Sequence, residues 1–384
     1  MRKVAIIGTG MTKVDKHWRK SLKELFGEAG IAALNQTGSP AIDCLIVGNM
    51  CASDLSDQNN IGALLADYLG FVPNTAYRVE AACGSGGAAF LAAYSAVASG
   101  MYDVVMTGGV EKLTDGVGGN TTLSLGKAAD AEYELFYGSS FVSLNAMIMR
   151  YYMDHYGVPR EAFADFAVLM HRNGSRNPFA QLPFEIKRET VLNSDMISDP
   201  ITLFDCAPVG DGAAALILCP LEDAKKYSDD FVEVAGISGA TDTINIASRE
   251  SLLSFRSTVT AADRAYRMAH ISPADIDVAE IHDTFTITGV LSLEDLGFCE
   301  RGKFHKMMMN GAFEPGGVVA VNPSGGLKSR GHPVGATGAY QIAELFLQLT
   351  GRAGKMQVPD ASIGLAQNIG GSGSSTYVTV LRRV

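Results

Sequence analysis

Two stretches of the chain, SPAIDCLIVG at residues 39–48 and SPADIDVAEI at residues 272–281, share a Ser-Pro start, an acidic residue and an apolar run. Short apolar runs alternate with helical patterns elsewhere, which is typical of an α/β fold with mainly parallel strands. Further pairs occur in the same order in both halves: Val4 to Gly10 with Val232 to Gly239, helices Gly87 to Gly100 with Gly338 to Gly351, and Thr107-Gly108-Gly109 with Ile369-Gly370-Gly371. This self-similarity predicts a duplicated α/β unit.

The two predicted helices of the repeat are apolar on nearly every face, so we expect them to be buried all round. Two such helices between two sheets give five layers (α-β-α-β-α). We assign residues 1–113 and 205–230 to the first unit and residues 231–384 to the second. Residues 114–204 have no counterpart and are rich in Met, Tyr and Phe. They are expected to form an insertion over the site, whose side chains make a local core or ligand contacts.

Composition narrows the functional class. Of the 384 residues only 19% are charged, so a large interior or large subunit interfaces are expected. The net charge of −10 argues against nucleic acid as a partner. The six cysteines form no CxxC pair, which predicts reduced thiols without a zinc site or disulfide framework. With no apolar signal stretch or membrane span, we expect a cytoplasmic protein.

Cys83 lies in a glycine-rich turn, AACGSGG at residues 81–87, that opens the first apolar helix. The free N–H groups and the positive dipole end of a helix favour a thiolate. Cys83 is therefore a candidate nucleophile. The alternative is a buried, inert thiol, because free cysteines are often fully buried.

Two histidine segments supply candidate partners for Cys83: IHDTF at residues 281–285 and GHPVGATG at residues 331–338. His332 lies just before the helix that matches the one after Cys83, so a pseudo-twofold axis would bring the two together. His282 follows a predicted strand, at the rim where open α/β sheets place their ligands. Each histidine alone is equally typical of a satisfied core or loop residue.

These motifs resemble those of the thiolase superfamily along essentially the whole chain. AACGSGG, NPSGG at residues 322–326, GHPVGATG and the final NIGGSG run occur in the family's order and spacing, and GHPxGATG is the most specific of them. The His-Asp-x-Phe segment is similar to that of archaeal acetyl-CoA acetyltransferases and their sterol-carrier-protein-type relatives.

The resemblance implies a reaction. His332 would take the proton of Cys83, whose thiolate would attack acetyl-CoA to give an acetyl-enzyme. The N–H groups of Cys83 and Gly370 would hold the oxyanion, and His282 with His332 would hold the enolate oxygen of a second acetyl-CoA. The product would be acetoacetyl-CoA, at the head of mevalonate synthesis. No metal or bound cofactor is implied, and coenzyme A thioesters are the substrates.

Two positions depart from the family. Many thiolases carry a second, proton-moving cysteine where this chain has Asn368, and sterol-carrier-type members carry one where it has Thr284. Neither substitute titrates near neutrality, so the group that removes the α-proton stays open. Asn368 and Asn322 are supporting candidates.

Alternative functions are 3-oxoacyl-CoA thiolysis, decarboxylating Cys-His-His condensation, and a scaffold subunit of a multienzyme complex. The resemblance further implies a homodimer or homotetramer. It also implies assembly with hydroxymethylglutaryl-CoA synthase and a small zinc- and OB-fold-containing protein.

Overall fold

The computed structural model describes residues 1–116 and 119–384. The α-helices are α1 Leu22–Asn35, α2 Ala52–Leu55, α3 Ile61–Leu69, α4 Ser85–Ala98, α5 Asn120–Gly126, α6 Phe141–Tyr156, α7 Arg160–Gly174, α8 Arg188–Leu192, α9 Arg256–Ala269, α10 Thr286–Asp295, α11 Phe304–Met309, α12 Gly326–Ser329 and α13 Thr337–Leu349. The strands are β1 Val4–Met11, β2 Cys44–Gly48, β3 Thr75–Val79, β4 Val105–Glu111, β5 Met196–Ser198, β6 Ile201–Thr202, β7 Gly212–Pro220, β8 Val232–Thr241, β9 Val278–Glu280, β10 Ala320–Val321, β11 Ile363–Gly370 and β12 Ser375–Arg383.

The strand order repeats between the two halves. The first half runs β3-β2-β4-β7-β1 and the second runs β10-β9-β11-β12-β8. β2 and β9, which hold the apolar runs of the two repeated SPxxID stretches, therefore occupy equivalent places. In each half the first three strands in this order are parallel to one another, and each of the last two is antiparallel to the strand before it. The predicted α/β fold with a duplicated unit is confirmed. The exact domain boundaries stay a prediction.

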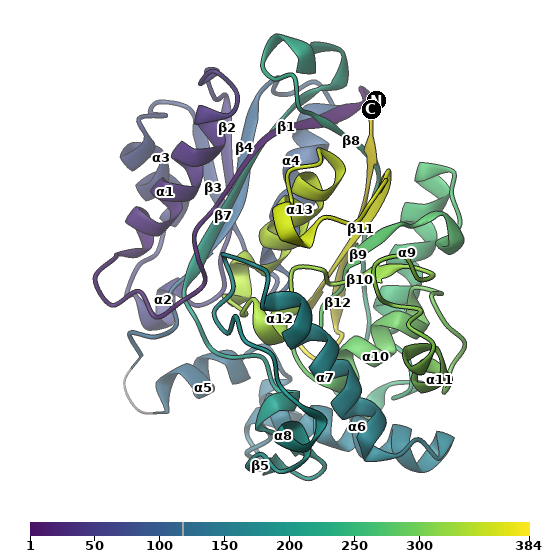
Figure 1. The fold of residues 1–384 in the computed structure, drawn as a ribbon. Helices are drawn as coiled ribbons and strands as arrows, with labels where there is room; N and C mark the ends of the chain where they lie inside the picture. The colour runs from purple at the N-terminus through teal and green to yellow at the C-terminus, as the bar shows by residue number, and fades with distance from the viewer. Residues whose placement is uncertain (117–118) are drawn as a thin grey trace.

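The two half-sheets are joined rather than separate. β1 and β8 pair antiparallel over two residues of each strand, Ala5 with Glu233 and Ile6 with Val232, which makes one ten-stranded sheet. The contact lies near the end where the two termini meet, and beyond it the halves separate around the central helices (Figure 1). The sequence predicted two separate sheets, and the structure joins them through the short β1–β8 ladder. Away from that ladder, the central helices keep the faces of the two half-sheets apart.

Helices α4 and α13 form the middle layer between the two halves of the sheet (Figure 1). Their N-terminal ends approach backbone to backbone, because a Cβ on Gly86 would lie only 2.9 Å from the Ala339 nitrogen and one on Gly338 only 2.4 Å from the Gly87 nitrogen. Glycine is the residue that permits such an approach. The outer layers are α1 and α3 on the first half and α9 on the second. The five predicted layers are present.

The segment between β4 and β7 differs most from its counterpart. It spans residues 112–211 and carries α5 to α8, whereas β11 and β12 are joined by the turn at residues 371–374. The predicted insertion falls in this segment, although its residues 117–118 lie outside the described ones. Phe163, Phe166 and Met170 of the insertion are fully buried in the core of the second half. No helix in residues 1–116 and 119–384 is long and apolar enough to cross a membrane.

Candidate active site

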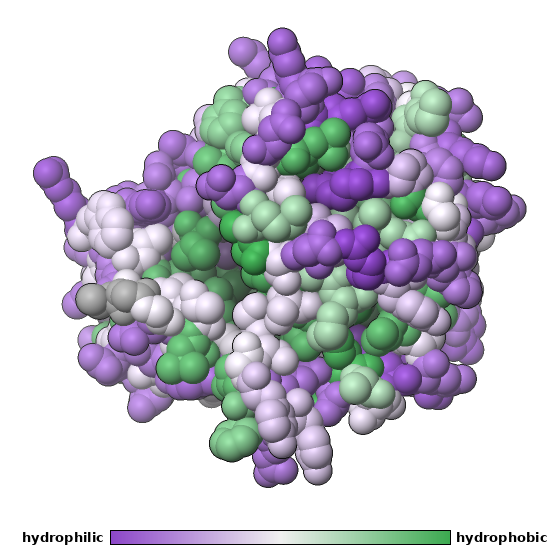
Figure 2. All heavy atoms as spheres, turned by 90° about the horizontal axis from the view of Figure 1, so that it is seen from below, coloured by the Kyte–Doolittle hydropathy of each residue, from purple (hydrophilic) through white to green (hydrophobic). Residues whose placement is uncertain are grey.

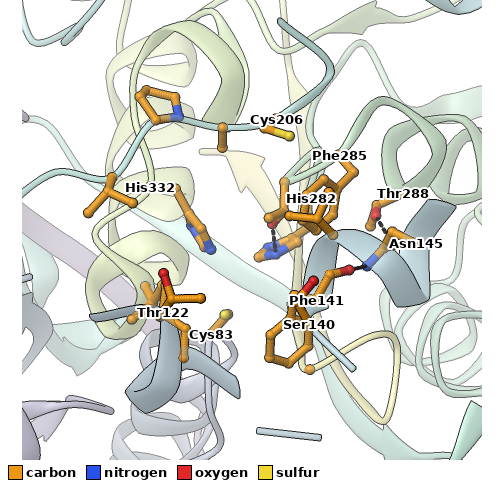
Figure 3. A pocket seen from close by; sticks show the side chains of 18 of the residues that line it. Cys83, Thr122, Ser140, Phe141, Asn145, Cys206, His282, Phe285, Thr288 and His332 are labelled. Carbon is orange, nitrogen blue, oxygen red and sulfur yellow. Dashed lines mark hydrogen bonds between the residues drawn. The ribbon is translucent and has the colours of Figure 1, made fainter. Parts of the chain in front are cut away.

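One cavity of about 210 Å³ opens between the two halves and the insertion. The face seen from below is hollowed, and hydrophobic side chains gather around the hollow (Figure 2). Cys83 comes from the first half, His282 and His332 come from the second, and the three side chains point toward one another (Figure 3). The two sequence-distant histidine segments and the cysteine turn are thus brought together. Phe141 and Val142 of the insertion complete part of the wall.

The turn that carries Cys83 lies between β3 and α4. The Ser85 hydroxyl accepts a hydrogen bond from the Ala81 N–H at 2.9 Å and donates one to the Ala82 carbonyl at 2.6 Å, and Ala82 has a φ of +52°. These bonds fix the thiol just before the helix begins. Burial and the nearby Glu111 carboxyl nevertheless raise the pKa of Cys83 to about 12, although the N–H groups of Cys83 and Gly371 act in the opposite direction. Desolvation thus outweighs the helix end, and the thiol needs a base to become a thiolate.

His332 presents an open nitrogen to the cavity. Its Nδ1 lies 2.7 Å from the Thr337 hydroxyl, and that hydroxyl donates to the Pro333 carbonyl. A hydroxyl that donates to the carbonyl accepts from Nδ1, which gives the tautomer with the imidazole proton on Nδ1. Nε2 then holds a lone pair and has no hydrogen-bond partner among the described residues. Burial, with the Arg330 charge, lowers the pKa of His332 to about 3, so the ring is neutral at neutral pH.

The GHPVGATG loop is anchored to the first half. Glu111, at the end of β4, accepts hydrogen bonds from the Gly335 N–H at 3.0 Å and from the N–H groups of Met50 and Cys51. Burial raises the pKa of Glu111 to about 7 even though these three donors favour its charged form. A single carboxyl group thereby ties the loop that carries His332 to the first half, whose β3–α4 turn carries Cys83.

His282 lies opposite His332, with ring centroids 5.2 Å apart and planes at 86°. Its backbone N–H donates to the Gln367 side chain, and its Nε2 lies 2.6 Å from the Thr284 hydroxyl. Its Nδ1 is 3.3 Å from the Asn368 side-chain nitrogen. Burial, His332 and Arg330 hold the pKa of His282 well below its ordinary value, so this ring is also neutral.

Arg330 contributes a buried positive charge next to both histidines. The side chain is fully buried, its guanidinium stacks 4.8 Å from the centre of the Tyr340 ring, and its three nitrogens have no hydrogen-bond partner within the described part of the chain. Its charge interacts with the buried carboxyl groups of Glu280 and Glu344, whose pKa values burial raises.

The remaining predicted residues have different placements. Gly370 pairs with Ser375 in the β11–β12 ladder, and the amide that approaches the Cys83 thiol belongs to its neighbour Gly371. Asn322 lies behind the site, where its side-chain oxygen accepts the Ile281 N–H at 2.6 Å and so supports the residue before His282. No three His, Cys, Asp or Glu side chains in the described ranges gather to hold a metal ion.

Several lining residues carried no signal in the sequence. Gly371 belongs to the NIGGSG run that was recognised, but nothing in the run distinguishes one glycine amide from the next. The insertion adds polar and apolar wall residues, and the segment before β7 adds a second thiol. These additional lining residues are Ser140, Asn145, Cys206, Val209 and Thr288.

Comparison with known proteins agrees with this geometry. The N-terminal domain model of thiolase matches residues 4–222, and the thiolase C-terminal domain-like model matches residues 238–383. Acetyl-CoA acetyltransferases of Methanothermobacter thermautotrophicus and Methanocaldococcus jannaschii are 45% and 42% identical to the chain, over all of both chains and over 99% of both, respectively. A solved Ltp2-ChsH2(DUF35) aldolase is 25% identical with a TM-score of 0.88, covering 99% of this chain and 98% of that one. The chain is an enzyme that belongs to the thiolase family.

Proposed function

We propose that this enzyme is an acetyl-CoA C-acetyltransferase that condenses two acetyl-CoA molecules into acetoacetyl-CoA through an acetyl-Cys83 intermediate. The observation that carries the proposal is the convergence of a thiol and two neutral imidazoles on one cavity. Two full-length relatives named acetyl-CoA acetyltransferases support the substrate class.

In the first half-reaction the His332 Nε2 lone pair accepts the Cys83 thiol proton as the sulfur attacks the thioester carbonyl. The bond between that carbonyl and the coenzyme A sulfur then breaks, and the proton passes from His332 to the departing thiolate. The N–H groups of Cys83 and Gly371 lie at the sulfur and would hold the oxyanion, which transfers to Gly371 the role expected of Gly370.

In the second half-reaction His332 has its lone pair again and takes the α-proton of the second acetyl-CoA. This assignment answers the absence of thiols at positions 284 and 368. His282 donates a hydrogen bond to the enolate oxygen, and the enolate carbon attacks the acetyl-Cys83 carbonyl. The Cys83 thiolate leaves and recovers its proton from His332, so the site returns to its starting state.

The absence of those two thiols also favours a second candidate, decarboxylating condensation, because loss of carbon dioxide generates the enolate without α-proton removal. The two reactions differ in the second substrate. Acetyl-CoA alone suffices for the proposed enzyme, whereas the second candidate requires a malonyl thioester. Thiolysis of 3-oxoacyl-CoA is the proposed reaction in reverse and needs free coenzyme A.

We further propose that the product feeds mevalonate synthesis in the cytoplasm and that the enzyme is a homodimer or homotetramer. We also propose a complex with hydroxymethylglutaryl-CoA synthase and a small zinc- and OB-fold-containing protein. The solved aldolase with the same fold is named together with a DUF35 partner, which supports a search for such a complex.

The test is to incubate the enzyme with acetyl-CoA, weigh the intact protein and assay acetoacetyl-CoA. We expect a mass gain of one acetyl group on the native protein, product formation from acetyl-CoA alone, and neither in Cys83→Ala. Alanine fits the turn, so that variant should keep its circular dichroism spectrum. An adduct on Cys83→Ala would remove the nucleophile assignment. Product from malonyl-CoA only would favour the decarboxylating reaction.

A further inference from the structure

We propose that Asn368 is a positioning residue that fixes the tautomer of His282, so that this imidazole presents an N–H at Nε2 to the cavity. Asn368 lies in β11 and is 2% exposed. The consequence for catalysis rests on the proposed acyl transfer, but the tautomer follows from the hydrogen bonds alone.

The orientation of the Asn368 amide is set by two backbone groups. The Gly87 N–H, which can only donate, lies 3.0 Å from Oδ1, and the Cys83 carbonyl, which can only accept, lies 3.1 Å from Nδ2. Reversing the amide would place a donor against a donor and an acceptor against an acceptor, which is costly in a buried site. Oδ1 therefore faces α4, and the Nδ2 amino group faces the cysteine turn and His282.

The His282 proton follows from that orientation. The Asn368 Nδ2 group lies 3.3 Å from His282 Nδ1, and because it can only donate, Nδ1 must accept. A neutral imidazole has one proton, which is then on Nε2, where the Thr284 hydroxyl lies at 2.6 Å as an acceptor. His282 thus donates at Nε2 while His332, its neighbour, accepts there. The two rings carry opposite tautomers in one cavity.

Close packing leaves the Asn368 amide no other position. A Cβ on Gly338 would lie 2.4 Å from its Oδ1, and a Cβ on Gly87 would lie 3.0 Å from the same atom. The side chain therefore fills the space where α4 and α13 meet. The Asn368 amide contacts the turn that carries Cys83, helix α4 and the His282 imidazole. It therefore sets the relative positions of these three groups as well as the tautomer of His282.

The experiment measures the tautomer directly. Histidine labelled with ¹⁵N is incorporated, and long-range ¹⁵N–¹H spectra distinguish a protonated Nε2 from a protonated Nδ1, with His282→Ala identifying the signals. We expect Nε2–H in the native protein. In Asn368→Asp the isosteric carboxylate accepts instead of donating, so we expect the proton on Nδ1. In Asn368→Ala no group remains to choose, and both tautomers should appear.

Asn322→Asp is the matched control, because it makes the same change at a buried asparagine whose side chain contacts the Ile281 N–H rather than the His282 ring. We expect this variant to retain Nε2–H. Kinetically, Asn368→Asp should lower condensation about a hundredfold but acetylation of Cys83 much less, the split expected when an oxyanion donor is lost.

A native His282 protonated at Nδ1, or an Asn368→Asp protein that retains Nε2–H with a native circular dichroism spectrum, would overturn the proposal. Equal losses in both half-reactions would reduce Asn368 to a structural residue. If the native enzyme makes no acetoacetyl-CoA, the proposed function fails but the spectra still decide the tautomer.

Discussion

The two halves of the molecule share a strand order but contribute unequally to the site. In the first half the connection from β4 to β7 spans residues 112–211 and covers the cavity, and in the second half the equivalent connection is the turn at residues 371–374. The first half supplies Cys83, the proposed nucleophile, and this cover. The second supplies both imidazoles, Asn368 and the Gly371 amide. The two halves thus share a strand order and differ in the residues that they bring to the cavity.

The largest effect is expected when the second half loses its base. In His332→Ala no lone pair receives the Cys83 proton, whose pKa of about 12 keeps the thiol neutral, so acetylation should slow by about three orders of magnitude. The measurement is the rate of coenzyme A release in a single turnover. His305→Ala, in α11 outside the cavity wall, is the control and should acetylate at the native rate. Rapid acetylation of His332→Ala would mean that the first half activates its own nucleophile.

His282→Ala separates the contributions within the second half. The enolate loses a donor while His332 keeps its lone pair, so acetylation should persist and condensation should fall by roughly two to three orders of magnitude. Single-turnover acetylation and steady-state acetoacetyl-CoA formation are compared in the same preparation. Equal losses in the two would show that His282 assists thiolate formation instead.

Gly86→Ala tests the close approach of the halves. An added Cβ would meet the Ala339 nitrogen at 2.9 Å and the Gly335 carbonyl oxygen at 3.0 Å, both backbone atoms, so overpacking should lower the free energy of unfolding by about 1–3 kcal/mol. Urea unfolding measures the change. Gly119→Ala, where a Cβ would meet no atom of a described residue within 4 Å, should change it by less than about 0.5 kcal/mol. Similar changes in the free energy of unfolding of the two variants would contradict the close packing of the halves at Gly86.

The last prediction concerns the proton that Cys83 of the first half and His332 of the second exchange in the proposed reaction. With Cys83 at a pKa of about 12 and His332 at about 3, both groups are neutral between these values. The thiolate fraction, and with it alkylation of Cys83 by iodoacetamide, should therefore rise about tenfold for each pH unit from 6 to 9. Mass spectrometry of the Cys83 peptide gives the rate. A rate that is already level above pH 7 would indicate a thiolate–imidazolium pair.

Much of the fold was predictable because periodic apolar runs and repeated motifs are local properties of the sequence. The stretches at residues 39–48 and 272–281 predicted equivalent strands, and the apolar helices near Gly87 and Gly338 predicted the buried middle layer; both predictions are confirmed. The β1–β8 ladder was not predictable, since it depends on how two distant strand ends happen to meet.

The site was predictable in its main residues and not in its electrostatics. Cys83 and the two histidines follow from motifs, and the structure places them in one cavity. The pKa of Cys83 depends on burial by the surrounding protein, which the turn sequence does not contain. Asn368 contacts Gly87 and Cys83, which precede it by 281 and 285 positions in the chain. The sequence therefore indicated only that a thiol was missing at position 368.

Arg330 has a consequence for the order of events. The Arg330 guanidinium carries a fixed positive charge and has no hydrogen-bond partner among the described residues. It lies near both imidazoles and lowers the pKa of each. In the proposed reaction a proton on His332 is therefore short-lived, because the imidazolium is repelled by the guanidinium and has little access to water. It moves on to the nearest sulfur anion, coenzyme A in the first half-reaction and Cys83 in the second. His332 relays protons and stores none, so each bond to sulfur that breaks is followed at once by neutralisation of the leaving group.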